Sequence, residues 1–211
     1  MAYDVVIFDL DGTLLDTLDD LMDSCNYALS TIGAPPRTRA EIRRFVGNGI
    51  RNLMLQAVPD GADNPKFEQA YETMQTWYKA HNQIKTAPYP GVQRLIRTLK
   101  QQGVPMAVVS NKPDASVQML VEQWFPEITF GLGEREGLRR KPERDMVDYA
   151  IAQLGQTGKK TVYVGDSEVD LTTAANAGLD CISVTWGFRD RALLVERGAK
   201  QFADTAEEPS T

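Results

Sequence analysis

Two aspartates stand two residues apart in the stretch DLDGT at residues 9–13, directly after an apolar run of strand length. Carboxylates as close as those of Asp9 and Asp11 repel each other unless a cation or a shared proton relieves the repulsion. An Asx-type turn, with Gly12 supplying backbone freedom, would account for one of the two aspartates but not for both. The pair therefore predicts a functional site at the end of a strand.

A second apolar run, residues 161–165, carries another aspartate, Asp166, at its carboxyl end. Magnesium is bound through oxygen ligands, often one or two carboxylates and several waters, so Asp166 is expected to be a further metal ligand. Glu168 and Asp170 follow at the start of a predicted helix, where acidic residues complement the helix dipole. We assign that structural role to Glu168, and we expect Asp170 to support the site.

Polar residues also follow the apolar run 106–109, where Ser110 brings a hydroxyl, Asn111 an amide and Lys112 an ammonium group. Ser110 could donate to a phosphoryl oxygen, but a serine here could equally be the N-cap of the next helix. Lys141 lies in a basic stretch of a loop, which is usually solvated surface. Whether Ser110 and Lys141 belong to the site depends on the strands and helices that position them.

Short apolar runs alternate with segments of helical periodicity, which is typical of an α/β domain with parallel strands. The expected strands cover residues 3–10, 106–110, 161–165 and 181–185. The expected helices include residues 91–102 and 142–154. Because the carboxyl ends of parallel strands share one edge, the polar residues should meet there. We predict a doubly wound, Rossmann-like parallel sheet.

Residues 15–88 interrupt this rhythm with several helical patterns and no convincing strand. Thr38 and Glu41 fit a capping box at the start of one of these helices. We therefore predict a small all-helical cap over residues 15–88, inserted into a catalytic core formed by residues 1–14 and 89–211.

The composition is that of an ordinary soluble protein, with 42% hydrophobic residues and no apolar run long enough to span a membrane. No basic or extended apolar leader precedes the first strand, so we expect a cytoplasmic protein. The net charge of −6 argues against nucleic-acid binding. Cys25 and Cys181 lie far apart, and we expect both to be buried as small apolar residues.

Four motifs in order resemble the haloacid dehalogenase superfamily of phosphotransferases over nearly the whole chain. They are DLDGT at 9–13, a strand ending in Ser110, Lys141-Pro142, and GDSEVD at 165–170. The stretches FVGNGIRNL at 45–53 and SNKP at 110–113 are similar to the phosphoglycolate phosphatase-like branch. One departure is GLGE at 131–134, where many relatives of that branch have a different turn.

The resemblance implies a role for each matching residue. Asp9 would attack phosphorus and carry the phosphoryl group, and Asp11 would act as general acid and then as general base. Magnesium would be held by Asp9, by Asp166 and by the backbone carbonyl of Asp11. Lys141 and Ser110 would bind the remaining phosphoryl oxygens.

Further residues are expected to assist. Asp170 would orient Lys141 or a metal-bound water. Residues 47–49 precede a predicted helix, and their backbone N–H groups could bind an anion. Arg51 could bind a carboxylate or a second phosphate of the substrate, or it could be an ordinary surface arginine. The expected substrate contacts are Gly12, Thr13, Asn48, Gly49, Arg51 and Asn111.

The implied function is a magnesium-dependent phosphatase that hydrolyses a small phosphate monoester, phosphoglycolate-like or a sugar phosphate, through an aspartyl phosphate. Asp11 disfavours dehalogenase and phosphonatase activities. A sugar phosphomutase would preserve all four motifs and stays an alternative, as does a non-catalytic receiver-like phosphoacceptor, which would lack a cap. The expected partner is a small phosphorylated metabolite, with no nucleic acid and no membrane, and the chain would be a monomer or weak homodimer.

Overall fold

The computed structural model describes residues 3–206, which form two compact units. The core unit comprises the chain up to Leu15 and from Pro88 onward, and the helical unit comprises Asp16–Ala87. The chain passes between the units at two short strands, β2 (Leu15–Asp16) and β3 (Ala87–Pro88), which pair with each other. The expectation of no strand in this segment is therefore wrong at both boundaries, because two-residue strands are too short to show a periodic pattern.

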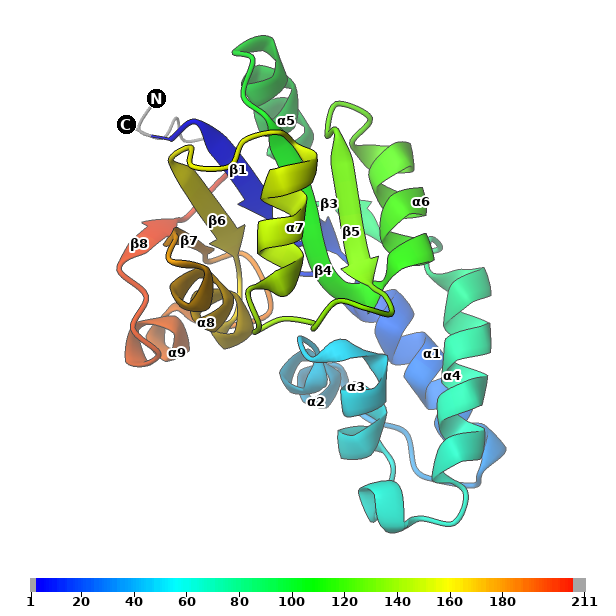
Figure 1. The fold of residues 1–211 in the computed structure, drawn as a ribbon. Helices are drawn as coiled ribbons and strands as arrows, with labels where there is room; N and C mark the ends of the chain where they lie inside the picture. Colours follow the sequence, from blue (N-terminus) through cyan, green and yellow to red (C-terminus); the bar gives the residue numbers. More distant parts are fainter. Residues whose placement is uncertain (1–2, 207–211) are drawn as a thin grey trace. The chain divides into compact units, whose positions relative to one another are not determined.

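The core unit contains a six-stranded parallel sheet in the order β5-β4-β1-β6-β7-β8 (Figure 1). The strands are β1 (Val5–Phe8), β4 (Met106–Pro113), β5 (Phe130–Glu134), β6 (Thr161–Gly165), β7 (Asp180–Val184) and β8 (Gln201–Ala203). The four expected strands and the doubly wound parallel sheet are confirmed. Strands β5 and β8 lie at the two edges and were not expected.

Strand β5 was hard to foresee because glycine is unfavourable in strands, and two of its five residues are glycines. A Cβ atom at Gly131 would press on Val117 and Val121 of the neighbouring helix. A Cβ atom at Gly133 would collide with the backbone of Asp114. Both glycines therefore let the chain that follows β4 pack closely against the edge strand.

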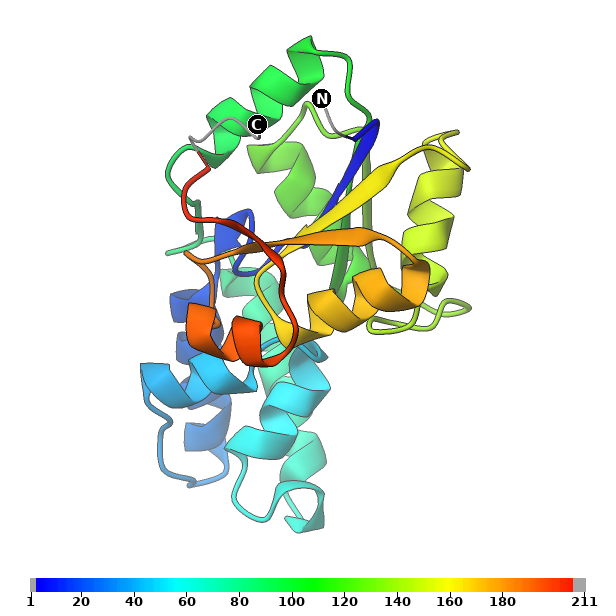
Figure 2. The ribbon, with the colours of Figure 1, turned by 90° about the vertical axis from the view of Figure 1, so that its left-hand side faces the viewer.

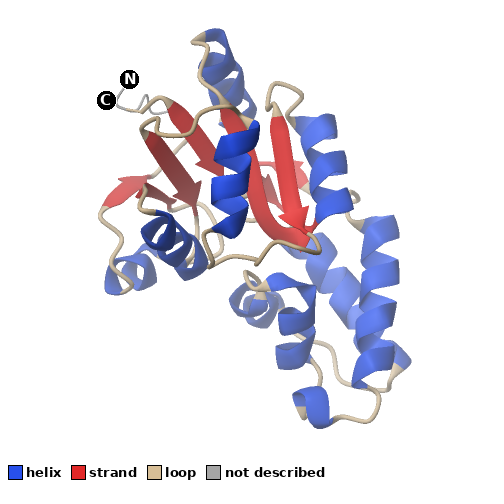
Figure 3. Ribbon diagram, in the orientation of Figure 1, coloured by secondary structure: helices blue, strands red, loops and turns tan. Residues whose placement is uncertain are grey.

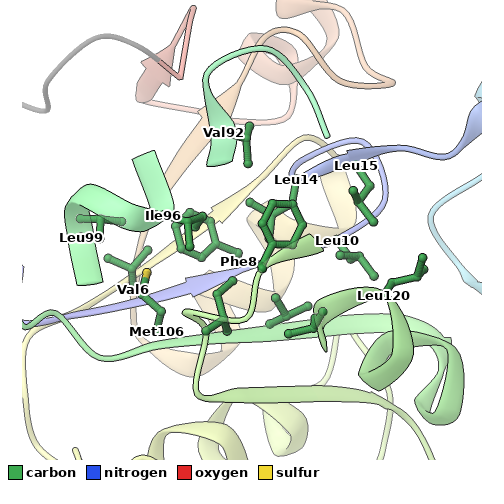
Figure 4. Close-up of a cluster of buried hydrophobic side chains, with 14 of the residues drawn as sticks. Val6, Phe8, Leu10, Leu14, Leu15, Val92, Ile96, Leu99, Met106 and Leu120 are labelled. Carbon is green, nitrogen blue, oxygen red and sulfur yellow. The ribbon is translucent and has the colours of Figure 1, made fainter. Parts of the chain in front are cut away.

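Helices cover both faces of this sheet (Figure 2). They are α5 (Val92–Gln101), α6 (Asp114–Trp124), α7 (Asp145–Gln153) and α8 (Glu168–Ala177). The short helix α9 (Arg191–Glu196) lies between β7 and β8 in the chain. Successive residues of β1 point to opposite faces. Val6 and Phe8 pack with α5 and α6 (Figure 4), whereas Val5 and Ile7 pack with α7 and α8. The expected helix over 142–154 begins three residues late, because the chain after Lys141 is still a loop.

The helical unit contains α1 (Leu18–Thr31), α2 (Arg39–Phe45), α3 (Gly49–Ala57) and α4 (Phe67–His81), with a 3₁₀ turn at Gly61–Asp63 (Figure 3). The capping box of Thr38 and Glu41 is confirmed, with both reciprocal hydrogen bonds present. The carboxylate of Asp20 is buried and accepts hydrogen bonds from the backbone N–H groups of Lys85 and Thr86. This carboxylate ties the returning chain to α1.

Within the described residues, no helix is long and apolar enough to cross a membrane. Both cysteines are free thiols. Cys25 is buried as expected, but Cys181 is only partly buried because it lies on β7, close to an edge of the sheet.

Candidate active site

The carboxyl ends of three adjacent strands bring the candidate residues together in the core unit (Figure 1). Strand β1 lies between β4 and β6, with Phe8 paired to Val108 on one side and Val164 on the other. Asp9 follows β1 directly, the 110–112 segment ends β4, and Asp166 follows β6. The register of these three strands therefore brings the residues to the same edge of the sheet, as predicted.

Three buried carboxylates, those of Asp9, Asp166 and Asp170, have ligand oxygens within 4.8 Å of one another. Burial, together with the charge of Asp170, raises the pKa of Asp9 well above its usual value. The same two causes raise the pKa of Asp166 to about 7. Burial and the neighbouring charge of Asp170 thus both disfavour the ionised forms of Asp9 and Asp166 when no cation is present.

Asp170 is the member of this cluster whose oxygens are already fully engaged. Its Oδ2 accepts hydrogen bonds from the backbone N–H groups of Asp166 and Ser167, at 3.1 and 3.0 Å, and from the Ser167 hydroxyl at 2.7 Å. Its Oδ1 lies 2.8 Å from Lys141 Nζ. Asp170 therefore fixes its neighbours, and Asp9 and Asp166 are the carboxylates that could hold a metal.

Lys141 is buried, although its loop could have been solvated surface. Its Nζ lies 2.9 Å from Asp9 Oδ1 and 3.0 Å from the Tyr163 hydroxyl, in addition to Asp170. Burial lowers the pKa of Lys141, but the charges of Asp170 and Asp9 outweigh burial and hold the pKa well above its usual value. Lys141 is therefore a permanent cation beside Asp9, and Tyr163 is a neighbour that the sequence did not single out.

Ser110 and Asn111 are both buried at the end of β4. Ser110 is not a helix cap, since α6 starts at Asp114 with Pro113 in the cap position, so that alternative is wrong. The Asn111 amide donates to the backbone carbonyl of Lys141 at 3.0 Å. Asn111 thereby holds the Lys141 loop, and a substrate contact for it stays a prediction.

Asp11 has a partner that the sequence analysis did not select. Lys112 Nζ lies 2.9 Å from Asp11 Oδ1 and 3.2 Å from Oδ2, and only 2% of the Lys112 side chain is exposed. A lysine at the end of a strand is normally exposed, so the residue type gave no signal. Its position beside Ser110 in the sequence was the one available indication.

Two glycines let the backbone close around Asp166. Gly12 has a left-handed φ of 84°, and a Cβ atom at either Gly12 or Gly187 would collide with the Asp166 side chain. Thr13 donates to Asp166 Oδ1 at 3.3 Å, and the backbone N–H of Phe188 donates to Oδ2 at 2.6 Å. The carboxylate therefore has one orientation, and Gly187 is a site residue that the sequence analysis missed.

The donor set fits magnesium. Asp9 and Asp166 offer hard oxygen ligands of the kind that Mg²⁺ prefers. Burial and the charge of Asp170 raise the pKa values of both carboxyl groups, and a divalent cation between them would favour their ionised forms. The backbone carbonyl of Asp11, two residues after Asp9, belongs to the same turn.

The remaining predicted contacts lie in the helical unit. Asn48 occupies the N-cap position of α3, and Gly49 begins the helix with a φ of 77°. Arg51 pairs with Glu68 at 3.1 Å and lies over the rings of Phe67 and Tyr71. These contacts give Arg51 a structural role within the helical unit. The substrate contacts of Asn48, Gly49 and Arg51 stay predictions.

Comparisons with known proteins show what the whole chain is similar to. The model of the family described as haloacid dehalogenase-like hydrolase matches residues 6–184. The phosphoglycolate phosphatase of Pseudomonas putida is 33% identical over 194 residues, covering 87% of this chain and 70% of that protein. The phosphoglycolate phosphatase of Agrobacterium fabrum is 32% identical over 198 residues, covering 88% and 82%.

A solved structure shows the same fold. It belongs to a protein from Lactobacillus delbrueckii subsp. bulgaricus that is provisionally described as a phosphoglycolate phosphatase. The two chains are 40% identical, with a TM-score of 0.93 over 98% of this chain and 96% of the other.

Proposed function

We propose that this protein is a phosphatase, because the chain belongs to the haloacid dehalogenase-like hydrolase family. The proposed reaction is magnesium-dependent hydrolysis of a small phosphate monoester through an aspartyl phosphate on Asp9. The observation that carries the proposal is the buried carboxylate of Asp9 held 2.9 Å from the ammonium group of Lys141. The relatives named as phosphoglycolate phosphatases make phosphoglycolate the first substrate to test.

In the first half-reaction a carboxylate oxygen of Asp9 bonds to phosphorus while the bond from phosphorus to the ester oxygen breaks. Asp11 gives its proton to the departing oxygen. In the second half-reaction a water oxygen attacks phosphorus and Asp11 takes the proton from that water. The bond between phosphorus and Asp9 then breaks, which releases phosphate and restores both side chains.

Other residues of the core unit prepare Asp9 for this attack. The backbone N–H of Leu10 donates to Asp9 Oδ1 at 2.7 Å, and Lys141 contacts the same oxygen, so the carboxylate is held in one orientation. Lys141 and Ser110 would bind phosphoryl oxygens, and such preorganised charge is the main means of lowering the barrier to phosphoryl transfer. Asp170 and Tyr163 keep Lys141 in place.

Magnesium, held by Asp9, Asp166 and the Asp11 carbonyl, would neutralise the charge that otherwise keeps an anionic nucleophile from an anionic ester. The collisions that a side chain at Gly12 or Gly187 would cause show how closely the backbone surrounds Asp166. That closeness gives the metal ligand little freedom to turn away.

We also propose that the helical unit acts as a cap. It would supply Asn48, Gly49 and Arg51 to the part of the substrate that leaves with the ester oxygen. Exclusion of bulk water during the reaction is the usual purpose of such a unit.

Phosphate release from phosphoglycolate, 2-hydroxyethyl phosphate and several sugar phosphates, with magnesium and with EDTA, tests the proposal. Asp9→Asn keeps the size of the side chain but removes the nucleophile, and we expect activity to fall about 1,000-fold or more. Glu143→Gln makes the same carboxylate-to-amide change at an exposed position and is the control. Activity of Asp9→Asn near that of the control, or no phosphate release by folded wild-type protein, would refute the proposal.

A further inference from the structure

Lys112 is a buried cation for which the proposed reaction gives no role. Its ammonium group contacts both carboxylate oxygens of Asp11, at 2.9 and 3.2 Å, within the core unit. The side chains of Lys112 and Asp11 are 2% and 16% exposed. Replacing a buried ion pair by apolar residues is often neutral or stabilising, so the fold alone gives little reason for a lysine here.

The backbone around Lys112 is firmly held. Its N–H donates to Ser110 Oγ at 3.2 Å, and the pairing of β4 with β5 shifts register between Val109 and Pro113. An irregularity of this kind re-aims the side chains of a strand. The Lys112 carbonyl lies against Gly133, where a Cβ atom would come within 2.5 Å of it. The direction of the Lys112 side chain is therefore built into the strand.

The position of Asp11 relates Lys112 to the substrate. To protonate the ester oxygen, Asp11 must come within hydrogen-bond distance of it, about 2.6–3.2 Å. Lys112 Nζ contacts the same carboxylate, so it lies beside the leaving group, whereas Lys141 lies beside Asp9 and the phosphoryl group. An ammonium group offers three donors and a compact charge, which suits an anion close to the ester oxygen.

We infer that Lys112 recognises a carboxylate one carbon away from the ester oxygen, and so selects phosphorylated 2-hydroxy acids over phosphate esters of neutral alcohols. The inference rests on the proposed phosphatase function and deepens it. When the substrate is bound, its carboxylate shares the ammonium group with Asp11. Lys112 is thus a specificity residue on the leaving-group side, complementary to Lys141 on the phosphoryl side.

Two substrates that differ in whether they carry a carboxylate test the inference. Phosphoglycolate and 2-hydroxyethyl phosphate share the ester oxygen and its CH₂ group, but only the first has a carboxylate. In the wild type we expect a lower KM for phosphoglycolate, by about 10- to 100-fold, the range for a charge-assisted hydrogen bond. Lys112→Met and Lys112→Gln should bring the ratio of the two KM values toward one, mainly through the KM for phosphoglycolate. Lys112→Arg should restore part of the preference.

The outcomes separate the inference from the proposed function. If the wild type hydrolyses neither ester, the phosphatase proposal fails. If it hydrolyses both, and the Lys112 variants lose activity toward both esters by the same factor, Lys112 serves only Asp11 and the inference is wrong. Equal KM values for the two esters in the wild type would overturn the inference without any variant. That comparison therefore decides the question even if a variant does not fold, as checked by circular dichroism.

Discussion

Lys141 Nζ lies 2.8 Å from Asp170 Oδ1, and both side chains are almost completely buried. Asp170 does not face a substrate, because its other oxygen accepts hydrogen bonds from the turn that carries Asp166. A single carboxylate therefore fixes both the cation beside Asp9 and the turn that carries Asp166. This relationship makes Asp170 a positioning residue whose loss should affect stability and activity together.

Asp170→Asn should reduce the free energy of unfolding by about 3–5 kcal/mol, the usual loss when one partner of a buried ion pair is removed. The new amide group would also face donors that now point at a carboxylate. Urea denaturation measures the loss. Asp148→Asn removes an exposed ion pair with Arg144 and should change stability by about 0.5 kcal/mol or less. Equal stability of the two variants would contradict the assigned role.

Tyr163→Phe should lower stability by about 1–2 kcal/mol, because its hydroxyl contacts Lys141 and donates to the Val109 carbonyl at 3.2 Å. We also expect kcat to fall about tenfold while KM changes little, since Lys141 loses one contact that orients it. Thermal unfolding and steady-state kinetics test both effects. Tyr3→Phe is the matched control, because its hydroxyl makes an exposed hydrogen bond to Asp180 at the amino end of β7.

Gly187→Ala should weaken the apparent magnesium affinity by about tenfold or more, because the added methyl group would collide with Asp166. Titration of activity with Mg²⁺ gives this value. Gly155→Ala is the control, since its φ of 68° adds backbone strain but nothing lies within 4 Å of the new Cβ. If both variants require the same magnesium concentration, Gly187 does not shape the metal ligand.

Without metal, the stability of the core unit should fall as pH rises from about 4 to about 7. The folded pKa of Asp166 is about 7 and lies above the usual value of 3.8, so the folded chain holds more protons than the unfolded chain in this interval. The upper limit of the change is about 4 kcal/mol. Magnesium should raise the unfolding temperature more at pH 8 than at pH 5. Stability in EDTA that rises over this interval would contradict the assigned charge state.

Arg51→Ala tests the cap proposal. If Arg51 binds the leaving part of the substrate, we expect KM to rise about tenfold with a smaller change in kcat. Glu68→Gln breaks the same ion pair but leaves the guanidinium in place, so its KM should stay near that of the wild type. Similar KM values for both variants would restrict Arg51 to packing over Phe67 and Tyr71.

Much of the core unit could be predicted because its signals are local. The apolar runs that form β1, β4, β6 and β7 are contiguous in sequence, and parallel strands bring the polar residues after them to one edge. The capping box of Thr38 and Glu41 spans only three residues and was likewise predictable. Strand β5 was missed because its glycines are needed only for packing against α6 and the chain before it.

By itself the sequence determined that Asp9, Asp11 and Asp166 would follow strands of a parallel sheet. Lys141 was expected in the site only from the family resemblance, and the tertiary structure placed it beside Asp9 and added Lys112 beside Asp11. Lysine side chains are normally exposed to solvent, but those of Lys141 and Lys112 are buried, and each contacts an aspartate that is distant in the sequence. Lys112 meets Asp11 across a separation of 101 residues. The free energy of burying a charge depends on such distant partners, so the burial of these lysines cannot be predicted from the residues next to them in the sequence.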